Sequence, residues 1–275
     1  MTASLPRLAA VIFDMDGVVT RTTPLHSRAW KRLFDEYLDE RRGRGEEHAR
    51  FDPVRDYLDH VDGKPRYEGV RDFLVARGID LPFGDPGDGP GVESCCGLGN
   101  RKDGYFEALV REEGVEVFET TVARLRELRA AGVKTALVTS SRHGRELVER
   151  AGLLGLFDAV LDGHTAQERR LRGKPEPDLF LEAARELGVD PGRAAVVEDA
   201  VSGVEAARAG GFGLVVAVDR GANRPALERA GPDVLVDDLG ELSVADLATP
   251  PTPARRPGSP PVARAGGSRS RPPRR

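Results

Sequence analysis

The sequence predicts an α/β fold in which a doubly wound parallel sheet carries an inserted helical segment. From about residue 119 onward, short apolar runs alternate with helical patterns, which is typical of parallel strands joined by helical crossovers. An earlier apolar run at 8–13 predicts a further buried strand of the same sheet. The intervening residues, about 22–113, show helical patterns only, so we expect them to form a separate helical unit.

The strands are predicted from short apolar runs bounded by Gly or polar residues, and they cover 8–13, 133–138, 159–161, 194–197, 213–218 and 233–236. The helices between the later strands are predicted at 119–131, 143–151, 176–187, 201–209 and 224–230. In the insertion, the spacing of the apolar residues predicts a long helix over 24–42 and shorter ones at about 53–61, 66–77 and 100–113. The stretch 80–91 is too rich in Gly and Pro for regular structure.

Charge is distributed unevenly along the 275 residues, whose formal net charge is -4. Residues 249–275 contain seven Arg and no acid, which leaves 34 basic and 45 acidic residues, a net charge of -11, in the remainder. A remainder with so much negative charge is not expected to bind nucleic acid. The Arg/Pro-rich tail has too few apolar side chains to form a folded core. We expect a core at 1–21 and 114–248, a helical domain at 22–113, and a disordered tail at 249–275.

The cellular setting is predicted from two absences. No run approaches the roughly 18 to 20 apolar residues of a spanning helix, and the amino terminus lacks a signal-type pattern, so we expect a cytoplasmic protein without membrane contact. The only cysteines, Cys95 and Cys96, are adjacent, which favours reduced thiols over a structural disulfide or metal site and leaves a vicinal redox pair as the alternative. A monomer or weak dimer is expected.

Two carboxylates separated by one residue, Asp14 and Asp16, end the first apolar run. Open α/β sheets bind ligands just beyond the carboxyl ends of their strands. Residues i and i+2 of an extended segment point to the same side, so both carboxylates could face one pocket and share a metal ion and a proton-transfer task. The alternative is a simple Asp-x-Asp-Gly turn after a strand.

Three further polar groups occur at the ends of later apolar runs or before a helix. They are Thr139-Ser140-Ser141, Gly173-Lys174-Pro175 and Glu198-Asp199. Viewed alone, the hydroxyl run is typical of a helix cap and Lys174 of a surface lysine. The hydroxyl, the lysine and the acid pair nevertheless follow in an order that one catalytic site could use, which favours the functional interpretation.

This ordered set resembles the haloacid dehalogenase (HAD) superfamily of phosphoryl-transfer enzymes, whose four motifs are an Asp-x-Asp, a Ser/Thr, a Lys and an acidic pair. Over about residues 8–240 the sequence is similar to the β-phosphoglucomutase branch in particular. The matching motifs are Phe-Asp-Met-Asp-Gly-Val-Val-Thr at 13–20, Gly-Lys-Pro-x-Pro-Asp at 173–178 and Val-Glu-Asp-Ala-x-x-Gly-Val at 197–204. The resemblance implies a Rossmann-like HAD core with an inserted α-helical cap domain that closes over the site.

The resemblance also implies a role for each motif. Asp14 becomes the nucleophile that forms an aspartyl phosphate, and Asp16 the general acid and base, with its backbone carbonyl facing the metal. Thr139 and Lys174 would bind and neutralise the phosphate. The implied cofactor is Mg²⁺, a hard cation that prefers oxygen ligands. Its candidate site is Asp14, Asp16, Glu198 and Asp199, with Glu198 placed to orient metal-bound water.

Substrate choice is expected to come from the cap. In the branch, a Gly and an Arg matching Gly63 and Arg66 hold the distal phosphate of a sugar bisphosphate, but Asp62 stands where a lysine is common, and Lys64 follows two residues later. By resemblance His26 couples cap closure to proton handling, although a plain helix histidine is the alternative. His143 contacts the sugar or simply starts a helix. The substrate-binding candidates are His26, Gly63, Lys64, Arg66, Ser140, Ser141 and His143.

These expectations favour Mg²⁺-dependent phosphoryl transfer on a small sugar phosphate, namely a β-phosphoglucomutase reaction from β-glucose 1-phosphate to glucose 6-phosphate. The first alternative is a sugar-phosphate phosphatase, which uses the same residues but admits water to the aspartyl phosphate. A non-catalytic binding protein is the remote alternative, because Asp14, Asp16, Lys174 and Asp199 are all present.

Overall fold

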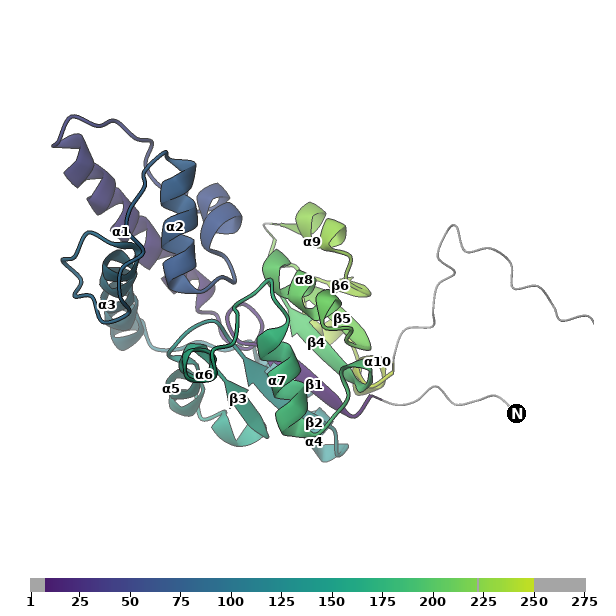
Figure 1. The fold of residues 1–275 in the computed structure, drawn as a ribbon. Helices are drawn as coiled ribbons and strands as arrows, with labels where there is room; N and C mark the ends of the chain where they lie inside the picture. The colour runs from purple at the N-terminus through teal and green to yellow at the C-terminus, as the bar shows by residue number, and fades with distance from the viewer. Residues whose placement is uncertain (1–7, 222, 250–275) are drawn as a thin grey trace, which may run out of the picture.

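A six-stranded parallel sheet forms the centre of the computed structural model, which describes residues 8–221 and 223–249 (Figure 1). The strands are β1 Ala10–Asp14, β2 Lys134–Val138, β3 Ala159–Leu161, β4 Ala194–Glu198, β5 Leu214–Val218 and β6 Val234–Val236. Their order is β3-β2-β1-β4-β5-β6, and every neighbouring pair is parallel. The predicted doubly wound parallel sheet is confirmed.

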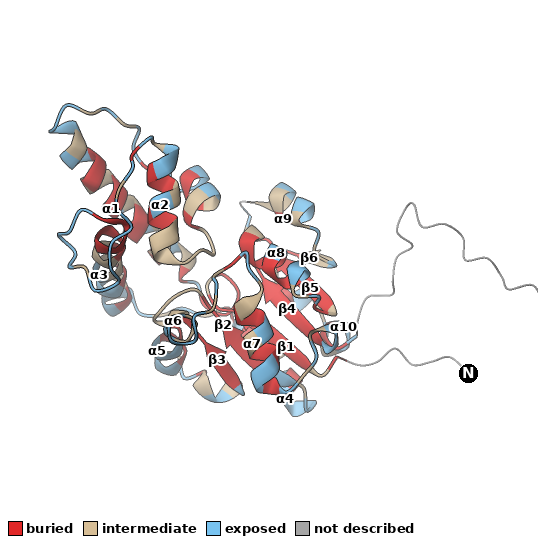
Figure 2. Ribbon diagram, viewed as in Figure 1, coloured by how far each residue is buried: buried red, intermediate tan, exposed pale blue. Residues whose placement is uncertain are grey.

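Helices cover both faces of the sheet, and most of the strand residues are therefore buried, as Figure 2 shows. Within β1, Val11 and Phe13 pack into one apolar cluster with α4 (Glu119–Ala130) and α5 (Gly144–Arg150). Ala10 and Ile12 pack into a second cluster with α7 (Asp178–Leu187) and α8 (Val201–Ala209). This alternation explains why the strand is apolar throughout. The other core helices are α6 Gly163–Arg169, α9 Arg224–Ala230 and α10 Val244–Leu247.

The cap has an apolar core of its own, beside the sheet in Figure 1. Its elements are α1 Thr23–Arg42, a π-helical turn Tyr57–Val61, α2 Arg66–Ala76 and α3 Cys95–Glu113. Aromatic rings fill the space between α1 and α2, where the ring centroids of Phe34 and Phe73 lie 3.9 Å apart. Such packing stabilises a helical unit that does not depend on the sheet for its core.

Some predicted elements have the wrong limits, and two short helices were not predicted. Helix α3 begins at Cys95 instead of residue 100, because the Ser94 hydroxyl accepts a hydrogen bond from the Gly97 N–H at 3.0 Å and caps the helix. The segment predicted as a helix over 53–61 contains the π-helical turn. Helices α6 and α10 were not predicted; both are short, and side-chain caps from Asp162 and Ser243 define their starts more than apolar periodicity does.

Both cysteines are buried free thiols. None of the helices within the described ranges is long and apolar enough to cross a membrane. Residues 250–275 of the predicted tail lie outside the described residues. The exact domain boundaries, the cytoplasmic location and the monomeric or weakly dimeric state stay predictions.

Candidate active site

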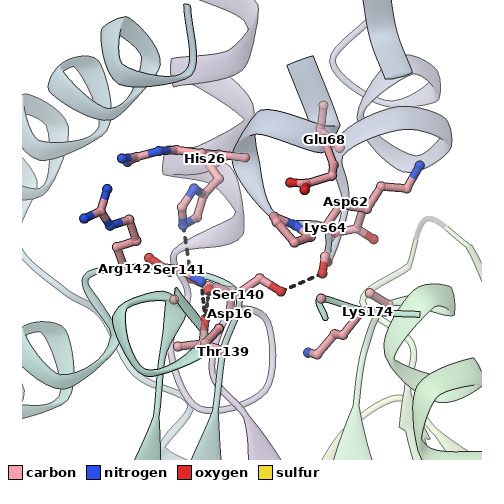
Figure 3. Close-up of a pocket in the computed structure, with 18 of the residues that line it drawn as sticks. Asp16, His26, Asp62, Lys64, Glu68, Thr139, Ser140, Ser141, Arg142 and Lys174 are labelled. Carbon is pink, nitrogen blue, oxygen red and sulfur yellow. Dashed lines mark hydrogen bonds and ion pairs between the residues drawn. The ribbon is translucent and has the colours of Figure 1, made fainter. Parts of the chain in front are cut away.

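The predicted catalytic side chains meet at the carboxyl edge of the three central strands. Asp14 ends β1, Thr139 follows β2 and Glu198 ends β4, and these strands are neighbours in the sheet. A cavity of about 410 Å³ lies between this edge and the cap. Figure 3 shows the core residues below and the cap residues above. Twelve of the thirteen candidate residues line the cavity, and the exception is His143.

Asp14 and Glu198 share one buried cation. The Lys174 ammonium, whose side chain is 1% exposed, contacts Oδ1 of Asp14 and Oε1 of Glu198. The two carboxylates raise the pKa of Lys174 against the opposing effect of burial, so the lysine is charged. Burial raises the pKa of Asp14, and the charge of Lys174 offsets this only in part. The ammonium of Lys174 thus lies directly beside Asp14, the candidate nucleophile.

The two acids at the end of β4, Glu198 and Asp199, make different contacts. Oε2 of Glu198 accepts backbone N–H bonds from Asp199 and Ala200, both at 2.8 Å, so both of its oxygens are engaged. Asp199 lies against Gly17, where a Cβ atom would come within 1.7 Å of Oδ2 and where φ is +84°. Only glycine fits there. Backbone packing therefore fixes Asp199 toward the cavity.

The oxygens of this cluster fit a hard divalent cation. One oxygen each from Asp14, Glu198 and Asp199 can be chosen so that all lie within 4.8 Å of one another. Burial and the charges of Asp62 and Glu198 raise the pKa of Asp199. Without a cation these buried carboxylates repel one another, so the cluster is the kind of donor set that Mg²⁺ stabilises.

Asp16 is surrounded by donors rather than acids. The Thr22 hydroxyl donates to Oδ1. The Thr139 hydroxyl donates to Oδ2 at 3.1 Å, and Nε2 of His26 lies 3.3 Å from Oδ1 (Figure 3). Burial opposes ionisation, but the nearby imidazole of His26 and the two threonine bonds lower the pKa of Asp16 to about 2. Asp16 is therefore a carboxylate in the absence of ligand.

His26 connects Asp16 to a second cap helix. Its Nδ1 lies 2.6 Å from the Lys102 ammonium on α3, and its ring stacks on Phe106 with centroids 3.9 Å apart. Burial lowers the pKa of Lys102 to about 7, and burial together with Lys102 lowers the pKa of His26. No sequence pattern singles out Lys102, because its direction depends on how α3 packs against α1.

The hydroxyl run after β2 contacts the cap. The Ser140 hydroxyl donates to the backbone carbonyl of Gly63 at 2.9 Å, as the dashed line in Figure 3 shows. Beside it, the Ser202 hydroxyl donates to the carbonyl of Asp62 at 3.3 Å. The Ser141 N–H donates to the Thr139 hydroxyl at 3.0 Å, which shapes the turn before α5. The cap is thus closed onto the core at Asp62 and Gly63.

The cap residues with charged side chains point to different places. Asp62 faces the core acids, and burial, followed by the charge of Glu198, raises its pKa to about 7. Lys64 pairs with Asp72 at 3.0 Å. Arg66 forms an ion pair with Asp103. Asp62, which stands where the branch commonly has a lysine, therefore lies at the metal cluster, away from the arginine expected to bind a distal phosphate.

Comparison with known proteins decides the family. Residues 8–211 match the family model described as haloacid dehalogenase-like hydrolase. The chain belongs to this family. It is 46% identical over 240 residues to a β-phosphoglucomutase of Mycobacterium tuberculosis, covering 86% of this chain and 92% of the relative.

Solved HAD structures have the same fold. A β-phosphoglucomutase from Clostridium difficile superposes with a TM-score of 0.68 at 22% identity, covering 86% of this chain and 93% of that one. CbbY from Rhodobacter sphaeroides, solved in complex with phosphate, gives 0.66 at 26% identity over 87% and 99%. The HAD core with an inserted cap, expected from the motifs, is thereby confirmed, and the chain is a HAD-family enzyme.

Sequence reasoning missed several residues of this HAD-family site. Asp103 and Arg142 line the cavity and Thr22 donates to Asp16, and none of the three was predicted. Thr22 could have been noticed as a hydroxyl in the turn after Asp16, whereas Asp103 carries no motif. His143 precedes α5 outside the cavity, and its Nε2 donates to Asp103 at 3.0 Å.

Proposed function

We propose that this HAD-family enzyme transfers a phosphoryl group on a small sugar phosphate through Asp14, and that it interconverts β-glucose 1-phosphate and glucose 6-phosphate. The observation that carries the proposal is one cavity between core and cap that is lined by a cation from each: Lys174 at the nucleophile and Arg66 on the cap. A sugar that carries phosphate at either end needs such a pair of anchors. The 46% identity to a β-phosphoglucomutase supports the same assignment.

In this scheme Asp14 is first phosphorylated by a sugar bisphosphate, and the sugar hydroxyl then attacks the phosphorus of the aspartyl phosphate. Asp16, ionised because of its donors, takes the proton from that hydroxyl as the new P–O bond forms and the bond to Asp14 breaks. In the reverse transfer, protonated Asp16 returns the proton to the leaving sugar oxygen. Thr22 and Thr139 orient the carboxylate throughout.

Asp14 and Asp199 are the residues we expect to hold Mg²⁺, with Glu198 behind them because its oxygens are already engaged. When bound, the ion supplies positive charge that offsets the charge of the transferring phosphate. Lys174 contributes a second positive charge at the nucleophile.

The alternative is hydrolysis of the aspartyl phosphate by the same residues. A carbohydrate phosphatase of Thermotoga maritima is 29% identical over 247 residues. The two reactions differ in whether water reaches the aspartyl phosphate. The hydrogen bond of Ser140 to Gly63 holds the cap against the core and so favours transfer to a sugar.

Phosphorus NMR with Mg²⁺, β-glucose 1-phosphate and a trace of glucose 1,6-bisphosphate tests the proposal. We expect glucose 6-phosphate to accumulate with little inorganic phosphate. Inorganic phosphate as the main product would establish the phosphatase instead. An Asp14→Asn variant keeps an amide oxygen and the other carboxylates for Mg²⁺ but should incorporate no phosphate, and turnover retained by that variant would contradict the assignment of Asp14 as nucleophile.

A further inference from the structure

The guanidinium expected to bind the distal phosphate is already occupied by groups of the cap. Nη1 of Arg66 pairs with Oδ2 of Asp103, and Nη2 donates to Oδ1 of Asn100 at 3.0 Å and to the Tyr67 hydroxyl at 3.3 Å. The remaining Nε is buried, with no hydrogen-bond partner among the described residues. Both terminal nitrogens, which would form the fork for a phosphate, are thus engaged by neighbours.

Asp103 is held in this position from a second side. Nε2 of His143, at the start of α5 in the core, donates to Oδ1 of Asp103 at 3.0 Å. The side chains of Arg66, Asp103 and His143 are only 14%, 19% and 16% exposed. Burial opposes ionisation of Asp103, but the bond from His143 and the charge of Arg66 hold its pKa well below the usual range. Asp103 is therefore an anion between two donors, one from the cap and one from the core.

We infer that Asp103 is a specificity-determining residue: an internal anion that competes with the distal phosphate of the substrate for Arg66. Arg66 and Asp103 both line the catalytic cavity, so an entering phosphate meets a carboxylate beside its arginine. Like charges at such short range repel strongly where water is scarce. The inference rests on the proposed function, since it concerns a ligand with a phosphate at each end.

Competition between Asp103 and the distal phosphate for Arg66 would assist a mutase reaction. The bisphosphate intermediate must leave the cap arginine and return in the opposite orientation. When the phosphate leaves, Asp103 pairs with Arg66 again, so no buried cation is left without a partner. The same bond from His143 joins cap to core while the phosphate is absent. Asp103 thus weakens the hold on the ligand and allows its release.

Calorimetric titration of glucose 1,6-bisphosphate in Mg²⁺ tests this inference, with the Asp14→Asn variant as the background so that no turnover occurs. Adding Asp103→Asn removes the charge but keeps an oxygen that can accept from His143. We expect the bisphosphate to bind roughly tenfold more tightly. Inorganic phosphate, which does not span the cavity, should gain much less.

Glu107→Gln is the matched control. Glu107 lies one turn further along α3, with Oε1 3.7 Å from Nε2 of His143, but it does not line the catalytic cavity. It should leave bisphosphate affinity unchanged. Unchanged or weaker binding in Asp103→Asn would overturn the inference, and Asp103→Ser provides a second neutral variant if Asn does not fold. If the bisphosphate binds to none of these proteins, the proposed function fails, and the inference fails with it.

Discussion

Around the nucleophile, four buried or half-buried carboxylates meet a single ammonium. Lys174 contacts Asp14 and Glu198, whereas Asp199 and Asp62 have no cationic nitrogen within 4.0 Å among the described residues. Burial is the largest cause of the raised pKa of Asp14, Asp62 and Asp199. These carboxylates are therefore a source of instability that a bound cation would relieve.

Asp62 gives this effect a measurable pH dependence in the metal-free protein. Its pKa is raised to about 7 in the folded state, above the value of about 4 expected in the unfolded chain. Between those values the folded state binds more protons, so stability is highest at low pH and falls as pH rises toward 7. Asp62→Asn should remove that part of the fall, of the order of 2 kcal/mol.

Thermal unfolding in EDTA at pH 5 and pH 7.5 provides the measurement. Asp59→Asn, at an exposed acid of the same π-helical turn, is the control and should keep the wild-type difference between the two pH values. An Asp62→Asn profile parallel to wild type would show that Asp62 does not face the core acids.

At the scale of elements, the turn between the π-helical segment and α2 is the contact that closes the cap. Gly63 has φ +68°, and a Cβ atom there would come within 2.4 Å of the Ser202 hydroxyl oxygen and 3.0 Å of Ala200 Cβ. Gly63→Ala should therefore cost about 1 kcal/mol through the backbone and also separate the cap from the core. We expect kcat to fall at least roughly tenfold, because misplacement by about 1 Å has large effects on transfer.

Gly78→Ala separates these two effects. Gly78, just after α2, has φ +71°, but a Cβ atom there would meet nothing within 4 Å. Both variants should lose about 1 kcal/mol in urea unfolding through the backbone, and Gly63→Ala should lose somewhat more because its Cβ meets Ser202 and Ala200. Only Gly63→Ala should lose activity. Equal activities would mean that closure at Gly63 is not needed for turnover.

The same contrast explains what could be predicted from the sequence. Asp14, Thr139 and Glu198 each follow their own strand, and parallel strands bring their ends to one edge, so the core part of the site follows from local patterns. The directions of Asp62 and Asp103 depend on how cap helices pack and close, which no local pattern encodes. Helix α6 was missed for a related reason: seven residues with an Asp162 cap and little apolar periodicity give only a weak pattern.

Over the whole molecule, two groups of described residues could hold a metal ion. One is Asp14, Glu198 and Asp199 in the core; the other is Asp103, Glu107 and His143 between cap and core. The second group already includes the ion pair of Asp103 with the Arg66 guanidinium, which disfavours a further cation. The first contains more acid than the one lysine can neutralise, so we expect Mg²⁺ to bind there.

Ligand binding to the folded state alone raises its stability, by about 2.7 kcal/mol at a concentration 100 times the dissociation constant. Mg²⁺ should therefore raise the Tm of the wild-type protein in a saturable way, beyond the effect of NaCl at equal ionic strength. Asp199→Asn should abolish this rise, because it removes a core ligand that only Mg²⁺ would neutralise, whereas Glu107→Gln should retain it. A Mg²⁺ response lost in Glu107→Gln but kept in Asp199→Asn would place the ion between cap and core, where it would compete with Arg66 for Asp103.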